Sequence, residues 1–188
     1  MTNNGLTERR MSNKRFYKKE HAIFIAICSC RDFPTVRKLA KMAHVSRSTL
    51  YRHHQKIHQI FQDYEEYLLK AYTRITKKFL AKKADYRILV LRTLIFIYNN
   101  RETFKELFGH NRKEVVKQMF KLLEPSVVDE WHLAGDLAKM YNVYINEILG
   151  IIEAWAAKGF PKDSIEQVLD DILYLTDNAR QNLLPIKD

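Results

Sequence analysis

Glycine and proline are scarce in this chain of 188 residues, which has 5 glycines and 4 prolines. Together they occupy 9 of the 188 positions, well below the ~12% that is usual in soluble proteins. Sheet proteins need many turns that contain these two residues, so the shortage argues against a sheet. We therefore expect an all-α protein with few connections.

Cysteine occurs only twice, at Cys28 and Cys30. Two thiols two residues apart in an apolar run form neither a disulfide framework nor a zinc site. We expect both to be small buried residues of a protein in a reducing compartment.

Long hydrophobic runs are also missing. The longest one near the N-terminus, Ala22–Cys30, has nine residues, which is too short to cross a bilayer. No small-x-small cleavage site follows it, as a signal peptide would require. We expect a buried helix here, no membrane association and a cytoplasmic protein.

Catalytic and metal-binding constellations are not found. His53, His54 and His58 lie close together, but no cysteine or carboxylate nearby completes a ligand set, so we expect no metal and no cofactor. No nucleophile with a base and no glycine-rich phosphate loop is present either. The sequence favours a binding protein over an enzyme.

Positive charge is what the chain has in excess, with a formal net charge of +10. Residues 1–83 contain 19 Lys/Arg and 6 Asp/Glu, a net +13, whereas residues 84–188 contain 13 and 16, a net −3. A basic N-terminal part on a nearly neutral body indicates a binding module for a polyanion, nucleic acid first. A basic solvated face without a partner is the alternative.

Apolar residues recur at helical spacing along most of the chain, which predicts roughly nine helices. We expect a flexible basic arm at residues 1–15, a three-helix domain at 16–62 and a helical bundle at 63–188. A long helix over about residues 57–82 would join the last two. Asn111-Arg-Lys-Glu114 resembles a capping box and predicts a helix start at that point.

The most informative stretch runs from Thr35 to His53. It predicts two short helices joined by a tight turn, with Leu39 and Leu50 facing inward and Ser46 as the N-cap of the second helix. The outer face of that helix offers hydrogen-bond donors with few acidic groups, as a helix in a major groove needs.

This stretch resembles the TetR family of bacterial transcription regulators. The residues that carry the resemblance are Thr35, Leu39-Ala40, Ala43-His44-Val45-Ser46, Ser48-Thr49, Tyr51-Arg52-His53-His54 and Ile60-Phe61. His44 and Ser48 stand where the family has glycine, and Ile57 stands where it often has a phosphate-binding lysine. The resemblance implies a helix-turn-helix that binds an operator, followed by a body for dimerisation and ligand binding.

We expect the DNA contacts to come from both short helices and the turn after them. By resemblance, Tyr51 and His53 reach phosphates, and neighbouring Lys56 substitutes for the family lysine. Arg47 begins the recognition helix, where side chains reach base edges. The candidate DNA-binding residues are Thr35, Arg37, Ser46, Arg47, Ser48, Thr49, Tyr51, Arg52, His53 and Lys56.

The body is rich in aromatic residues and methionine, and their spacing leaves open whether they form the core or an apolar effector pocket. The candidates for a pocket are Phe96, Phe104, Phe108, Met119, Phe120, Trp131, Tyr141 and Tyr144. The last two helices would pair across a two-fold axis in a homodimer. The candidates for that interface are Leu149, Ile152, Trp155, Val168, Ile172 and Leu175.

These features together predict a homodimeric DNA-binding regulator, a repressor that an apolar small-molecule effector releases from a palindromic double-stranded DNA operator. An activator or co-regulator whose body binds another protein subunit is the alternative.

Overall fold

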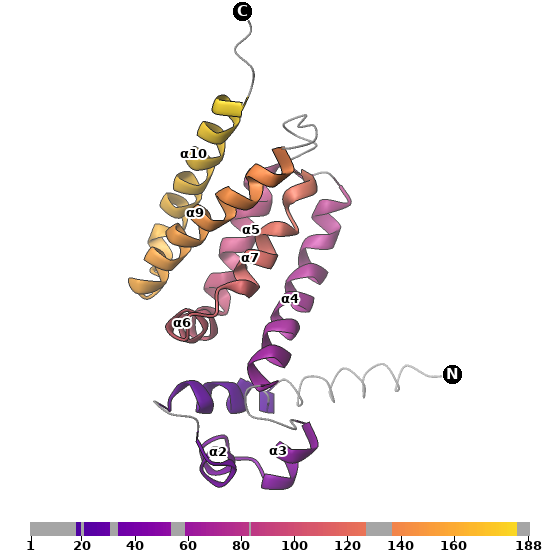
Figure 1. Cartoon of the computed structure of the whole chain (residues 1–188), viewed down its shortest axis with the longest axis vertical. Helices are drawn as coiled ribbons and strands as arrows, with labels where there is room; N and C mark the ends of the chain where they lie inside the picture. The colour runs from indigo at the N-terminus through magenta and orange to yellow at the C-terminus, as the bar shows by residue number, and fades with distance from the viewer. Residues whose placement is uncertain are drawn as a thin grey trace, which may run out of the picture. The chain divides into compact units, whose positions relative to one another are not determined.

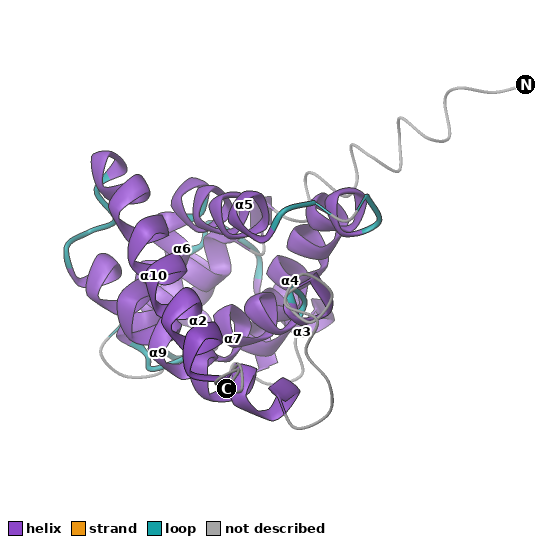
Figure 2. Ribbon diagram, turned by 90° about the horizontal axis from the view of Figure 1, so that it is seen from above, coloured by secondary structure: helices purple, strands orange, loops and turns teal. Residues whose placement is uncertain are grey.

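The computed structural model describes residues 18–19, 21–30, 34–53, 59–82, 84–126 and 137–183. Within these ranges the regular elements are helices and no strand occurs (Figure 2). The prediction of an all-α protein with roughly nine helices is therefore confirmed. No described helix has the length and apolar character that crossing a membrane requires.

Residues 21–28 form the first described helical segment. The later α-helices, labelled in Figure 1, are α2 (Val36–Met42), α3 (Arg47–His53), α4 (Gln59–Leu80), α5 (Tyr86–Asn99), α6 (Arg101–Gly109), α7 (Glu114–Lys121), α9 (Leu137–Ala157) and α10 (Ile165–Leu183). A short 3₁₀ helix, η1 (Lys162–Ser164), lies between α9 and α10.

The chain divides into two compact units, Met1–Tyr67 and Leu68–Asp188. Helix α4 begins in the first unit and ends in the second. The division lies five residues beyond the expected boundary at residue 62, and the arm expected at residues 1–15 lies outside the described residues.

Aromatic rings hold the first unit together. The ring of Phe24, in the helical segment 21–28, stacks on Tyr64 of α4 at 4.4 Å and meets Phe61 edge-on at 5.4 Å. Such pairs add about 0.5–1.5 kcal/mol to the stabilisation from burial. They hold the first helical segment against the start of α4.

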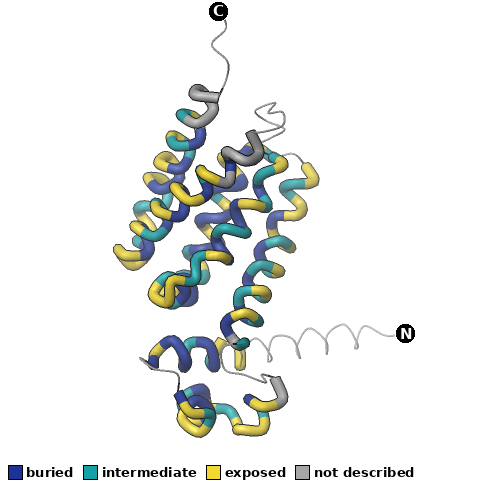
Figure 3. The backbone as a smooth tube through the Cα atoms, in the orientation of Figure 1, coloured by how far each residue is buried: buried dark blue, intermediate teal, exposed yellow. Residues whose placement is uncertain are grey.

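The second unit is a bundle in which α10 packs against α9 and α5, and α9 packs against α6 and α7. One side of helix α5 is buried in the bundle, with Leu89, Val90, Leu94 and Ile97 among its residues. In Figure 3 the backbone tube is coloured by burial, and buried residues recur along each of these helices. Burial of each such side chain stabilises the bundle by about 1.5–3 kcal/mol.

Several hydroxyl groups lie inside this bundle, each with a defined partner. The Tyr72 hydroxyl lies 2.7 Å from Thr93 Oγ1, which itself donates to the carbonyl of Leu89 at 2.9 Å. The Tyr141 hydroxyl donates to the carbonyl of Phe120 at 3.0 Å. Burial raises the pKa of both tyrosines well above the ordinary value of 10.0, because the charged phenolate is poorly solvated there.

A tight corner at Gly159–Pro161 joins α9 to η1. Gly159 and Phe160 both have positive φ angles, of 80° and 56°. The Phe160 ring is buried and meets the Trp155 ring edge-on at 4.9 Å. The Trp155 indole N–H donates to the carbonyl of Pro161 at 3.1 Å, so ring and backbone contacts hold the corner together.

The capping box predicted at Asn111–Glu114 is wrong. Asn111 has a φ of 56° and its N–H donates to the carbonyl of Phe108, so it ends α6. Asparagine tolerates this left-handed conformation better than most residues. Helix α7 begins at Glu114 with Lys113 as its N-cap and no capping side-chain hydrogen bond.

Candidate nucleic-acid interface

The first short helix begins at a side-chain cap. The Thr35 side chain accepts a hydrogen bond from the backbone N–H of Lys38 at 3.3 Å, and Thr35 itself is extended. This satisfies one of the free N–H groups at the start of α2. The Thr35 hydroxyl therefore has a structural partner besides any phosphate it would contact.

His44 ends α2 and makes the tight turn. Its φ is 53°, its N–H donates to the carbonyl of Lys41, and the next N–H, of Val45, donates to the carbonyl of Ala40. These two bonds form the Schellman arrangement, in which the left-handed residue is usually glycine. Histidine thus occupies the left-handed position of this turn, where glycine is usual. The left-handed conformation costs a residue other than glycine about 1–2 kcal/mol.

Ser46 caps the second short helix, as predicted. Its Oγ accepts from the backbone N–H of Thr49 at 3.1 Å and is hydrogen-bonded to the hydroxyls of Ser48 and Thr49, both at 2.8 Å. Three candidate DNA-binding hydroxyls therefore form one cluster at the start of α3. Each hydroxyl has to give up or share one of these hydrogen bonds in order to contact a base or phosphate.

Small and aliphatic residues form the contact between α2 and α3. Leu39, Ala40, Ala43 and Leu50 are buried, as expected for two helices that cross closely. Met42, the last residue of α2, is half-buried, and its Sδ lies 3.7 Å from the thiol of Cys30. Cys28 and Cys30 are buried and not disulfide-bonded, as expected.

The outer surface of these two helices is polar and basic. Arg37, Lys38, Arg47 and Ser48 are exposed, and Thr49 is half-buried. The side chain of Tyr51 is 65% exposed, so it does not pack into the core of its unit. The side chains of Arg52 and His53 and the whole of Lys56 lie outside the described residues.

Within the first unit, His21 and Tyr64 form a hydrogen bond that the sequence did not predict. The His21 Nδ1 and the Tyr64 hydroxyl are 2.7 Å apart. Partial burial lowers the pKa of His21, because the charged imidazolium loses solvation. No motif signals a contact between residues so distant in sequence, although their helices were both predicted.

The residues predicted to line an effector pocket are mostly inside the second unit. Phe96, Phe104, Met119, Phe120 and Tyr141 are buried. Phe108 and Tyr144 are half-buried, and Trp131 lies outside the described residues. A packed core and a closed pocket both require such burial, so both interpretations stand.

The residues predicted for the dimer interface belong to the interior of a single chain. Leu149, Ile152, Trp155, Val168 and Ile172 are buried, and Leu175 is half-buried. A side chain buried in its own chain has little surface left for a partner. The exposed apolar residues of these helices are others, Val143 on α9 and Tyr174 on α10.

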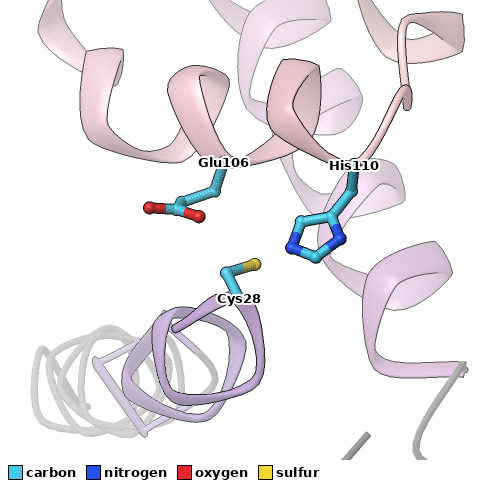
Figure 4. Close-up of side chains that lie close together, drawn as sticks. All are labelled: Cys28, Glu106 and His110. Atoms are coloured by element: carbon cyan, nitrogen blue, oxygen red, sulfur yellow. The ribbon is translucent and has the colours of Figure 1, made fainter. Parts of the chain in front are cut away.

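Glu106 and His110, one turn apart at the end of α6, project from the same side of that helix (Figure 4). Cys28, the third residue labelled there, belongs to the first unit. A glutamate and a histidine alone are too few ligands for a structural metal site, so we assign no metal to this pair.

No protein-family model, curated protein or solved structure matches the chain.

Proposed function

We propose that this protein is a sequence-specific DNA-binding transcriptional regulator of the TetR type. The observation that carries the proposal is the α2–turn–α3 unit, in which Ser46 caps a short helix whose outer face exposes Arg47, Ser48 and Tyr51. A helix presented in this way fits a major groove, where arginine pairs with guanine through two hydrogen bonds. In this proposal the protein binds DNA in the cytoplasm and catalyses no reaction.

The proposed active form is a homodimer, because each chain offers a single helix-turn-helix and a palindromic site needs two. The two recognition helices would then lie about one turn of DNA apart, ~34–36 Å. A dimer that pairs α9 and α10 would use their exposed sides, around Val143 and Tyr174. Sedimentation at micromolar concentration should give about twice the chain mass of 22.4 kDa, and a persistent monomer would contradict this part.

Regulation by a small apolar effector is the favoured mechanism. A ligand bound among the aromatic residues of the second unit would change the spacing of the recognition helices and release the DNA. The second candidate is an activator or co-regulator whose body binds another protein, and exposed Val143 and Tyr174 favour it.

Selection of bound duplexes from random DNA with purified protein tests the main proposal. We expect an enriched palindromic sequence, and recovery of no common sequence would contradict sequence-specific binding. Binding should also weaken about 10³–10⁵-fold from 50 to 200 mM salt if 6–10 phosphates are contacted.

Two substitutions separate base contacts from phosphate contacts on α3. Arg47→Ala should cost about 1–3 kcal/mol on the selected site and much less on random DNA. Tyr51→Phe keeps the ring and removes the hydroxyl, so its loss should be similar on both DNAs. Equal weakening of both DNAs by Arg47→Ala would make Arg47 a phosphate contact.

A further inference from the structure

More than half of the lysine and arginine residues lie in the second unit and not in the unit with the helix-turn-helix. Residues 1–67 contain 13 Lys/Arg and 6 Asp/Glu, a net +7, and residues 68–188 contain 19 and 16, a net +3. Residues 68–83 alone contribute six Lys/Arg and no Asp/Glu. This short segment thus concentrates nearly as much net charge as the whole first unit.

The segment is the second half of α4 and the turn after it, and its cations share one solvent-exposed side. Arg74, Lys77, Lys78 and Lys82 are all exposed; we call these four residues the α4 basic face. Within the described residues, none of the four takes part in an ion pair. Their charge is therefore available to a partner.

The geometry of the face is a row. Arg74 and Lys78 lie four residues apart on α4, which places them on one side of the helix about 6 Å apart along its axis, and Lys82 follows in the turn after the helix. Ala81, also exposed, lies between the last two, and its small side chain lets a partner approach closely. From α5, the Arg92 guanidinium lies 4.6 Å from the centre of the Phe79 ring and adds a cation at the edge of the row.

Helix stability alone does not account for this face. Cations favour the C-terminal end of a helix, but the effect falls off within the last turn, which here contains Lys77 and Lys78. Arg74 lies one turn earlier, and Lys82 lies beyond the end of α4 at Leu80. Ile75 is the one large apolar side chain exposed within the described part of this stretch.

We propose that the α4 basic face is a second nucleic-acid contact, which binds the phosphate backbone of duplex DNA without reading its sequence. This inference rests on the proposed DNA-binding function and extends it to the second unit. A row of unpaired cations with no acidic residue among them suits a line of phosphates. An anionic membrane, the other polyanion, favours larger apolar side chains beside the cations.

The test compares the salt dependence of binding for three full-length proteins. The face variant carries Arg74→Gln, Lys78→Gln and Lys82→Gln. The control carries Lys105→Gln, Lys121→Gln and Lys158→Gln, the same change in charge at exposed positions elsewhere in the second unit. A fluorescent random-sequence duplex of thirty base pairs is titrated by anisotropy at 50, 100 and 200 mM KCl.

The face variant should show a slope of log Kobs against log[salt] that is shallower by about 2–3, since each lost phosphate contact removes ~0.9. From 50 to 200 mM KCl it should therefore lose about 40-fold less affinity than the wild type. The control should keep the wild-type slope. Equal slopes for all three proteins, or an equal decrease in the face variant and the control, would overturn the proposal.

Two further measurements distinguish the other outcomes. If the wild type selects an operator but the face variant keeps its slope, this inference fails and the proposed function stands. If the wild type binds no duplex even at 50 mM KCl, both fail. Co-sedimentation with phosphatidylglycerol vesicles that is lost only in the face variant, with an unchanged slope on DNA, would assign the face to a membrane.

Discussion

The helix pair α2 and α3 and the second unit of the chain differ in where their hydroxyl groups lie. In α2 and α3 the polar residues lie outside, and the contact between the helices is made by Leu39, Ala40, Ala43 and Leu50. The second unit instead buries hydroxyl groups, among them those of Tyr72 and Thr93. Polar side chains are therefore left on the surface in α2 and α3, whereas some of those in the second unit stabilise its interior.

The largest effect should come from truncating an aromatic side chain in the second unit. Phe104 is fully buried and its ring lies 6.3 Å from that of Phe96. Phe104→Ala should lower the free energy of unfolding by about 3–5 kcal/mol in urea denaturation. Tyr51→Ala, on the exposed side of α3, should change it by less than ~0.5 kcal/mol. Similar losses of unfolding free energy for both variants would contradict this contrast between a buried and an exposed aromatic side chain.

The buried hydroxyl pair should give the next largest effect. Thr93→Val removes the oxygen that lies 2.7 Å from the Tyr72 hydroxyl, and leaving that hydroxyl without its partner should cost about 1–3 kcal/mol. Tyr51→Phe removes an exposed hydroxyl and should leave the melting temperature unchanged. If Thr93→Val left the free energy of unfolding unchanged, the hydroxyl pair would not stabilise the bundle.

Alkaline pH probes the same buried phenols. Tyrosines of the unfolded chain ionise near pH 10, whereas burial raises the pKa of Tyr72 and Tyr141 well above that value. The unfolded state therefore loses protons first, and the free energy of unfolding should fall as the pH rises above 10, by about 1.4 kcal/mol per pH unit for each phenol. Tyr72→Phe should reduce that slope in denaturation curves measured from pH 9 to 12. An unchanged slope would contradict the raised pKa of Tyr72 in the folded protein.

A smaller effect, of opposite sign, is expected at the turn of the first unit. His44 has a φ of 53°, a conformation that costs a non-glycine residue about 1–2 kcal/mol. His44→Gly should raise the free energy of unfolding by about 1 kcal/mol. Lys41→Gly, within α2, should lower it by about the same amount. Destabilisation by His44→Gly would show that the imidazole makes a contact that outweighs the strain.

The smallest effect should come from the surface of the second unit. Arg87 lies 3.2 Å from Asp170 and 3.7 Å from Glu166, but all three side chains are more than half exposed. Arg87→Gln should cost less than ~0.5 kcal/mol. A loss above 1 kcal/mol would mean that ion pairs as well as apolar contacts hold α5 to α10.

The sequence predicted the helices and the helix-turn-helix well, because each depends on neighbours a few residues apart. Leu39 and Leu50 follow from helical spacing, and the cap at Ser46 follows from residue type alone. The His21–Tyr64 bond joins residues distant in the sequence, which no local pattern specifies.

The dimer candidates illustrate a limit of periodicity. The strongest apolar stripe of α9 and α10, which includes Ile152 and Ile172, packs inside the chain. Periodicity identifies which side of a helix is apolar but not whether its neighbour belongs to the same chain. A charge count split at residue 83 groups the cations of α4 with the N-terminal part, whereas the structure divides the chain after Tyr67.

The corner at Phe160 restricts how this chain can diverge over time. The position needs a positive φ, which favours glycine, and also a buried ring against Trp155, which glycine lacks. Glycine here would relieve the backbone but lose the ring packing, and a small residue other than glycine would lose the packing without relieving the backbone. We expect related chains that differ here to differ at Trp155 or Phe108 as well, since both rings contact Phe160. Residue 160 would then vary as part of a group, with its neighbours deciding which side chains it accepts.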